Sequence, residues 1–256
     1  MWTKGSEVGL MRKRFMLFTR QIAIAVGWVI SKVLLDVKVV GAENVPRNPH
    51  PLIVIANHFS WFDAPILAVH LPFAPAFIVA TESQRYWWFR SFVKVFNAIP
   101  IWRGQVDREA FRRSMTALKE GYVLGIFPEG GMDPDFAEQV ARGETVNRYI
   151  PGRRIPVLAR PKSGTALLAI QTGSNILPVG LIGTERVYAN MLRLRRTPVT
   201  IRVGRPFGPL QIDPNLRGRA RRQRLDELSD LMMQQIAVLF PPENRGPYRN
   251  MELTAL

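Results

Sequence analysis

The chain has 256 residues, of which 47% are hydrophobic and 21% are charged, and this length is enough for one large domain with a substantial core. Lys and Arg outnumber Asp and Glu by 35 to 20, and the net charge of +15 predicts an anionic partner such as nucleic acid, an anionic membrane or a phosphorylated substrate. The absence of cysteine excludes disulfides, thiolate zinc sites and a cysteine nucleophile, and the three histidines are too scattered for a histidine-rich metal site.

The N-terminal segment, residues 1–35, is both basic and apolar. Only eleven uncharged residues separate Arg20 from Lys32, about half of what a membrane-spanning helix needs, and no convincing cleavage pattern indicates a removed signal peptide. We therefore predict an interfacial helix or helical hairpin, associated peripherally or monotopically with the cytoplasmic face of an anionic membrane. A soluble core helix with a basic edge remains the alternative. The side chains expected in the lipid are Phe15, Phe18, Ile22 and Trp28.

From residue 36 onward, short apolar runs alternate with segments of helical periodicity. Runs at 37–40, 52–56, 77–80, 99–102 and 123–127 are typical of strands, and helical spacing follows several of them. Asp107 is placed to cap one of these helices and Gly121 to end it. The pattern predicts an α/β domain over residues 36–240, with a mixed, largely parallel sheet flanked by helices, followed by an irregular tail at 241–256.

One strand end combines a histidine with a carboxylate. The run at 52–56 leads into Asn57 and His58, and the spacing of Ser60 and Asp63 is that of a capping box for a helix beginning at Trp61. With a turn between them, Asp63 can reach back to the imidazole, fix its tautomer and leave the other ring nitrogen to accept a proton from a hydroxyl. In the alternative interpretation, Asp63 only caps its helix and His58 is an ordinary turn histidine.

Two further strand ends carry charged residues. Arg103 follows the run at 99–102, and Glu129 and Gly130 follow the run at 123–127. In open α/β sheets, ligands bind beyond the carboxyl ends of the strands, so we expect these residues to lie near His58.

Four sequence blocks in this order resemble those of the glycerolipid acyltransferase family, in particular the branch that acylates 1-acyl-glycerol-3-phosphate to phosphatidic acid. The blocks are Asn57-His58-x4-Asp63, then residues 99–104, 127–130 and 176–179, and the resemblance covers roughly residues 36–210. It implies that His58 deprotonates the acceptor hydroxyl, which attacks an acyl thioester directly without an acyl-enzyme. Asp63 would orient this base.

The resemblance also implies an acceptor site. Arg103 would bind the acceptor phosphate, for which a fork of donors is well suited, and Glu129 with Gly130 would shape the pocket beside it. A carboxylate next to a phosphate is repulsive unless it binds substrate hydroxyls or holds Arg103 in place, and we take the second role as our hypothesis for Glu129. Lys162 is a second candidate for contact with the phosphate. In the alternative interpretation, it is an ordinary exposed lysine at the start of a helix.

The chain departs from the family pattern after the third block. Threonine or serine and then arginine usually follow there, whereas residues 131–134 read Gly-Met-Asp-Pro, and about thirty residues separate Glu129 from Lys162. Segment 131–161 could form a lid or part of the acceptor site. The acceptor therefore stays open between lysophosphatidate, another lysophospholipid and a glycolipid.

A cluster of arginines at positions 217–224 precedes a last helical pattern that ends near Phe240. These side chains could bind anionic lipid, the phosphates of coenzyme A or an acidic acyl carrier protein, or could simply be solvated.

The sequence thus predicts an enzyme that moves a fatty acyl chain from acyl-CoA or acyl carrier protein to the free hydroxyl of 1-acyl-glycerol-3-phosphate. No metal or bound cofactor is implied, because the donor brings the activated bond, and no nucleic acid is expected as a partner. The alternatives are a related acyltransferase with another lipid acceptor, and a non-enzymatic basic module that binds membranes or nucleic acid.

Overall fold

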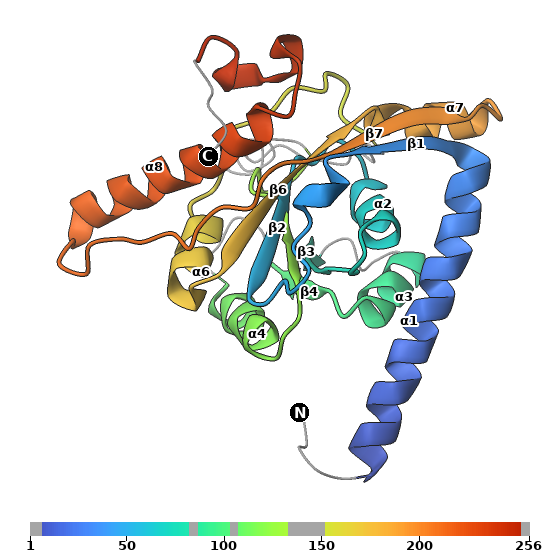
Figure 1. Cartoon of the computed structure of the whole chain (residues 1–256), viewed down its shortest axis with the longest axis horizontal. Coiled ribbons are helices and arrows are strands. Elements are labelled where there is room, and N and C mark those ends of the chain that lie inside the picture. The colour runs from blue at the N-terminus through green and yellow to red at the C-terminus, as the bar shows by residue number, and fades with distance from the viewer. Residues whose placement is uncertain (1–6, 82–86, 103–106, 133–151, 252–256) are drawn as a thin grey trace, which may run out of the picture.

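A sheet with helices on both faces forms the centre of the molecule (Figure 1). The computed structural model describes residues 7–81, 87–102, 107–132 and 152–251. In these ranges the sheet has seven strands in the order β1-β7-β6-β2-β5-β3-β4, and only the β6–β7 pair is antiparallel. The mixed, largely parallel sheet is therefore confirmed. The strands are β1 Leu35–Val40, β2 Leu52–Ala56, β3 Ala76–Ala80, β4 Ile99–Ile101, β5 Leu124–Ile126, β6 Asn175–Ile182 and β7 Thr197–Val203.

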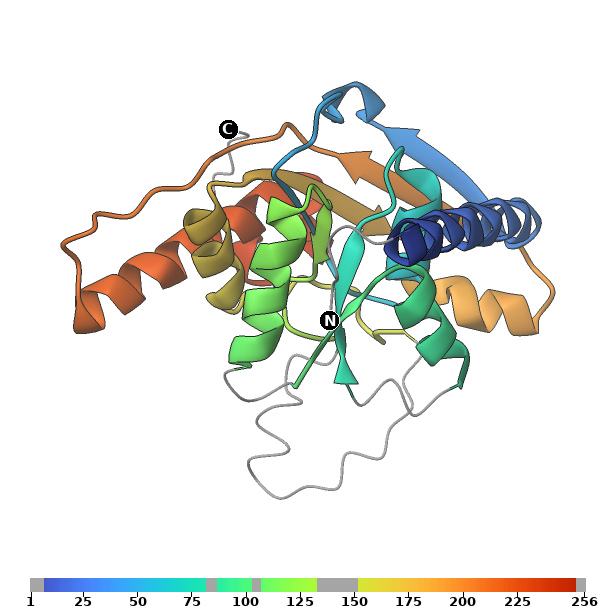
Figure 2. The same ribbon diagram turned by 90° about the horizontal axis from the view of Figure 1, so that it is seen from below.

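The helices divide between the two faces of the sheet (Figure 2). Helices α1 Glu7–Leu34, α2 Asp63–His70 and α3 Trp87–Val95 lie on one side, and α4 Arg108–Lys119, α6 Gly164–Thr172 and α8 Gly218–Ala237 lie on the other. Strand β2 shows why both faces are covered, because Leu52 and Val54 belong to one buried cluster and Ile53 and Ile55 to the other. A parallel strand buried on both faces has a continuous apolar sequence, as residues 52–56 do.

Shorter elements complete the chain: α7 Val187–Leu192 and the 3-10 turns η1 Ala42–Asn44, η3 Thr184–Arg186, η4 Pro242–Asn244 and η5 Gly246–Tyr248. Between α8 and residue 251, the tail therefore consists of single turns, but it is fastened to the domain. Tyr248 is buried and its hydroxyl donates to Asp230, while the side-chain amide of Asn244 donates to the carbonyl of Pro156.

Helix α2 begins at Asp63, two residues later than the predicted start at Trp61. Ser60 Oγ accepts from the amide of Phe62 at 3.3 Å, so the chain makes a turn over residues 61–62 before the helix starts. The other half of the capping box is present, since the Asp63 carboxylate accepts from the Ser60 amide at 2.7 Å.

Helix α1 is one continuous helix of 28 residues, so of the two predicted forms, a helix or a helical hairpin, the described part of this segment has the first. Its stretch Arg14–Leu34, 21 residues, is long and apolar enough to cross a membrane by length and composition alone. This stretch includes Arg20 and Lys32, and it is longer than the eleven uncharged residues between them because exposed apolar side chains continue before Arg20 at Phe18 and Phe15. The four side chains expected in lipid, Phe15, Phe18, Ile22 and Trp28, are all exposed.

Candidate active site

The imidazole of His58 is held by Asp63 at the end of β2. Asp63 Oδ2 lies 3.0 Å from His58 Nδ1 and also accepts from the amides of Phe59 and Ser60, at 2.7 Å each. Asp63 is completely buried, and an ionised carboxylate can only accept hydrogen bonds, so the proton of a neutral His58 lies on Nδ1. Nε2 then carries a lone pair on the far side of the ring, which leaves it able to accept a proton.

Aromatic stacking fixes the plane of the His58 ring. The ring lies 4.1 Å from that of Phe127 at an interplanar angle of 11°, and Phe127 stacks in turn on Phe77. Gly125 makes this arrangement possible, because a β-carbon there would lie 2.5 Å from a ring carbon of Phe77. The His58 side chain keeps 21% of its surface exposed, so a substrate hydroxyl can reach a ring whose orientation is already set.

Asn57, the first residue of the histidine motif, connects the end of β2 to β6 through its side chain. Its side-chain amide donates to the carbonyl of Leu181 at 2.9 Å and accepts from the amide of Leu181 at 2.7 Å. The fully buried side chain thus pairs with β6 as a strand residue would, one position beyond the end of β2. This contact fixes the point at which His58 leaves the sheet.

Glu129 lies behind the His58 loop, with its carboxylate used by protein groups. Oε1 accepts from the amide of His58 at 2.9 Å, and Oε2 accepts from Arg153 Nη1 at 2.7 Å and from the amide of Ala159 at 2.9 Å. Burial raises the pKa of the Glu129 carboxyl, whereas the Arg153 guanidinium and the two amides act in the opposite direction. Glu129 therefore connects the backbone at His58 with segment 152–159. Arg103, the partner predicted from the sequence, lies outside the described residues.

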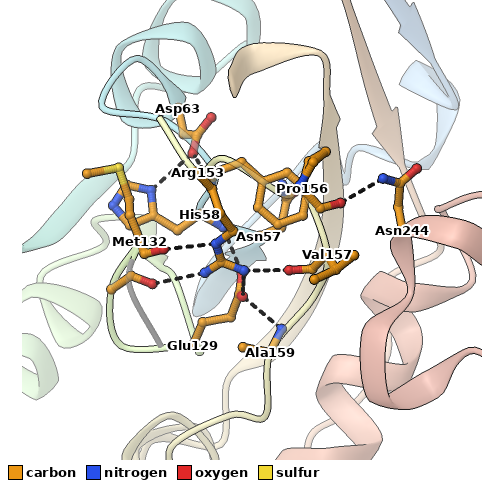
Figure 3. A network of polar contacts seen from close by, with 12 residues as sticks. Asn57, His58, Asp63, Glu129, Met132, Arg153, Pro156, Val157, Ala159 and Asn244 are labelled. Carbon is orange, nitrogen blue, oxygen red and sulfur yellow. Dashed lines mark hydrogen bonds and ion pairs between the residues drawn. The ribbon is translucent and has the colours of Figure 1, made fainter. Parts of the chain in front are cut away.

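Arg153 is the residue of this site that the sequence did not reveal. Its backbone amide donates to the carbonyl of Phe59 at 2.6 Å, and its guanidinium lies over the Phe59 ring, 5.1 Å from the centroid. Besides Glu129, the guanidinium donates to the carbonyls of Met132, Gly131 and Val157 (Figure 3). This buried arginine joins the His58 loop, the strand end at Glu129 and segment 152–158. Its position in a long aperiodic segment gave no signal of that role.

Gly130 and Lys162 lie side by side next to Glu129. Gly130 has a φ of +80°, in the left-handed region that glycine adopts without strain, and a β-carbon on it would lie 3.2 Å from Cγ of Lys162. The amide of Lys162 donates to the carbonyl of Pro128 at 2.8 Å, and its side chain is exposed. The structure thus brings His58, Asp63, Glu129, Gly130 and Lys162 to one end of the sheet. In the described ranges, no group of three or more His, Asp or Glu side chains is placed to hold a metal ion.

Comparison with known proteins places this chain in a family. A family model described as acyltransferase matches residues 36–182, more than half of the chain. The chain belongs to the acyltransferase family. The matched range begins in β1, ends with β6 and contains every predicted site residue.

Among the curated relatives of this acyltransferase, the 1-acyl-sn-glycerol-3-phosphate acyltransferase of Bacillus subtilis is 32% identical over 95 residues, 37% of this chain and 47% of that protein. The enzyme of the same name from Borreliella burgdorferi is 27% identical over 164 residues, 62% of this chain and 57% of that protein. The chain thus spans about half the length of these relatives.

A solved structure supports the fold of this acyltransferase. The crystal structure of the 1-acyl-sn-glycerophosphate (LPA) acyltransferase PlsC from Thermotoga maritima matches with a TM-score of 0.58 at 23% identity, covering 85% of this chain and 79% of that one. At this identity the match concerns the arrangement of helices and strands, including the mixed sheet that carries His58.

Proposed function

We propose that this acyltransferase moves a fatty acyl chain from an acyl thioester, carried by coenzyme A or acyl carrier protein, to the free hydroxyl of 1-acyl-glycerol-3-phosphate. The observation that carries the proposal is the pair of His58 and Asp63, in which a buried carboxylate holds Nδ1 while the ring stays partly exposed. The names of the relatives from two bacteria support the choice of acceptor.

In the proposed reaction, His58 Nε2 takes the proton of the acceptor hydroxyl as its oxygen attacks the thioester carbonyl. Asp63 stabilises the resulting imidazolium through Nδ1. When the tetrahedral adduct collapses, the carbon–sulfur bond breaks and the imidazolium returns its proton to the leaving thiolate. The products are phosphatidic acid and a free thiol, and no acyl group is attached to the enzyme at any step.

The acceptor phosphate needs cationic partners near His58. Arg103 is the first candidate by its place in the sequence, and Lys162 is the second, because its exposed side chain starts beside Gly130 at the same end of the sheet. The exposed apolar surface of α1 supports membrane association of the enzyme, where such an acceptor resides.

The base assignment is tested by removing His58. His58→Ala should lower kcat for acyl transfer at least about 100-fold, because a positioned general base contributes on that scale or more. The matched control is His50→Ala, which removes an exposed histidine from a loop on the same chain. Rates are measured as thiol release from acyl-CoA, with circular dichroism to check the fold. A His58→Ala variant that keeps the wild-type rate would refute the mechanism.

The acceptor is tested with the wild-type chain and labelled acyl thioesters. We expect acylation of 1-acyl-glycerol-3-phosphate at the highest kcat/KM in a panel that also contains lysophosphatidylcholine, lysophosphatidylglycerol and a glycolipid. A preference for an acceptor without the terminal phosphate would contradict the proposed substrate but would leave the assignment of His58 as the general base unaffected.

A further inference from the structure

The last residue of α7 and the turn that follows it, residues 192–196, carry two exposed leucines. Leu192 is 67% exposed and Leu194 is 96% exposed. The turn itself is well defined, because the amide of Arg195 donates to the carbonyl of Asn190 at 2.9 Å and the amide of Leu194 donates to that of Met191 at 3.1 Å. These two bonds are the ones that end a helix in a Schellman motif. The exposed leucines are therefore held in place by the fold.

Leu194 occupies the position in this motif that glycine usually takes. Its φ is +53°, in the left-handed region where a side chain of an L-residue is strained. Leucine at this position is unfavourable for the backbone, and its side chain gains almost no burial within the chain in return. A residue that breaks local rules without a gain in the folded monomer points to a contact outside it.

Arginines alternate with and follow these leucines. Arg193, Arg195 and Arg196 are exposed, and Arg196 donates to the carbonyl of Leu35 at 2.7 Å. Within the part of the chain that the structure describes, the side chains of Arg193 and Arg195 make no hydrogen bond or ion pair. Apolar side chains flanked by free guanidinium groups match the boundary between acyl chains and anionic headgroups.

The turn lies beside the C-terminal end of α1. Strands β1 and β7 pair with Leu35 opposite Thr197, so Leu34, the last residue of α1, is adjacent to the arginines, and Figures 1 and 2 show α7 at this end of α1. Exposed Lys32 on α1 adds a positive charge here, and exposed Asp36 on β1 adds a negative one. The local charge thus remains positive.

The surface of α1 that continues this turn is apolar. Gly27 and Ser31 face α2, where a β-carbon on Gly27 would lie 2.8 Å from Val69 and Ser31 Oγ lies 2.8 Å from His70 Nε2. Successive steps of three or four residues place the opposite stripe on one face of the helix, pointing away from α2. The exposed members of this stripe are Phe15, Phe18, Ile22, Val26, Val29 and Val33.

We propose that residues 192–196 are a second membrane-contacting element, which docks on an anionic bilayer together with the outer stripe of α1. Leu192 and Leu194 enter the headgroup boundary, and Arg193 and Arg195 bind lipid phosphates. This proposal rests on the proposed function for the lipid location of the acceptor, but it concerns a surface distinct from the His58 site.

The first test replaces Leu194 with glycine. Leu194→Gly relieves the left-handed backbone and removes the apolar side chain, so we expect an equal or higher unfolding temperature and about tenfold weaker partition of the full chain to phosphatidylglycerol vesicles. A purely structural role for Leu194 would change stability and partition in the same direction. Unchanged partition of Leu194→Gly would overturn the proposal.

The second test compares two pairs of arginines. Arg193→Gln/Arg195→Gln and Arg219→Gln/Arg222→Gln each lower the net charge of +15 by two, to +13. The second pair lies on α8, at the opposite end of the molecule from α7 (Figure 1). We expect the first pair to weaken binding to phosphatidylglycerol vesicles more strongly than the second. Equal weakening would mean that overall charge drives binding and would reject the turn as a contact.

The third test uses the absence of cysteine from the chain. A single Leu194→Cys residue labelled with an environment-sensitive fluorophore should brighten and shift to the blue on phosphatidylglycerol vesicles, whereas Asn215→Cys, exposed near the start of α8, should not. The proposal would be overturned if the fluorescence of the label at position 194 did not change on chains that sediment with vesicles. It would also be overturned if the chain did not bind the vesicles, or if the label responded to DNA alone. None of these binding measurements requires acyl transfer, so failure of the proposed activity would be seen separately.

Discussion

At the scale of single residues, the contacts of Arg153 explain how His58 is held. Glu129 bonds the amide of His58 with one oxygen and Arg153 with the other, and Arg153 also bonds the carbonyl of Phe59 through its own amide. Both side chains of the Arg153–Glu129 pair are almost fully buried. Removing one partner of such a pair leaves an uncompensated charge, which costs more than replacing both.

We predict that Arg153→Met lowers the free energy of unfolding by about 3–5 kcal/mol, because Glu129 loses its cationic partner in a buried site. The double variant Arg153→Met/Glu129→Gln should lose less than the sum of the two single variants, and Arg153→Lys should recover part of the loss. Chemical denaturation measures these values, with Arg154→Met, at an exposed neighbour, as the control.

The same variants test whether the pair positions His58. Variants that remain folded should have a lower kcat with little change in KM for the acceptor, because Arg153 and Glu129 act through the His58 loop and not through contact with the substrate. A Glu129→Gln variant with wild-type kinetics would contradict a positioning role.

The sequence revealed the contact of His58 with Asp63 but not that of Glu129 with Arg153, and sequence distance explains the difference. His58 and Asp63 are five positions apart, and the capping-box bond between Ser60 and Asp63 turns the chain between them, so local geometry alone brings them together. Arg153 lies 24 positions after Glu129, beyond a segment without periodicity, and only tertiary structure joins them. The resemblance to the family does not indicate this contact either, because Gly131 and Met132 stand where threonine or serine and then arginine usually follow the third block.

At the scale of elements, α1 packs along α2. Ser31 Oγ lies 2.8 Å from His70 Nε2, and Gly27 allows α1 to approach Val69 closely. Burial lowers the pKa of His70 below its ordinary value, and the charge of nearby Lys32 lowers it further. The folded state therefore favours neutral His70.

The lowered pKa of His70 makes the contact between α1 and α2 depend on pH. Since the pKa of His70 is lower in the folded state, the unfolded chain binds more protons, and stability falls as the pH drops below the ordinary value of about 6.5. We predict that wild-type stability decreases more steeply between about pH 7 and pH 5 than that of His70→Gln. Hydrogen exchange of the α1 amides measures the effect locally, with His50→Gln as control. Parallel pH curves for wild type and His70→Gln would contradict the assignment.

The elements themselves were largely predictable from sequence, and the exceptions have physical causes. Strand β2 was predicted at residues 52–56 because an apolar run buried on both faces needs no alternation. Asp107 caps α4 as expected, accepting from the amide of Ala110 at 2.9 Å. Helix α2 starts two residues after the predicted Trp61, because residues 61–62 form a turn before it. The apolar stretch of α1 is longer than the run between Arg20 and Lys32, because exposed apolar side chains also precede Arg20.

At the scale of the whole molecule, the turns η4 and η5 after α8 support the loop that carries His58. The carbonyl of Asn244 accepts from the amide of Leu158 at 2.9 Å, and its side-chain amide donates to the carbonyl of Pro156 at 2.7 Å. Segment 156–158 is the one whose Val157 carbonyl bonds Arg153. Burial and neighbouring Asp230 raise the pKa of Tyr248, which keeps its hydroxyl protonated to donate to Asp230 at 2.7 Å and fastens η5 to α8.

This connection predicts an effect on catalysis from a residue near the C-terminus. Asn244→Ala removes the bond to Pro156, and we expect a loss of about 1 kcal/mol in the free energy of unfolding. Because the weakened segment holds Arg153, and Arg153 holds the His58 loop, kcat should fall several-fold while KM for the acyl donor changes little. Steady-state kinetics and thermal unfolding measure the two quantities, with Asn215→Ala, an exposed asparagine near the start of α8, as control. If Asn244→Ala loses stability but keeps the full kcat, the tail supports only the fold, and the His58 loop is held by Glu129 and Asp63 without it.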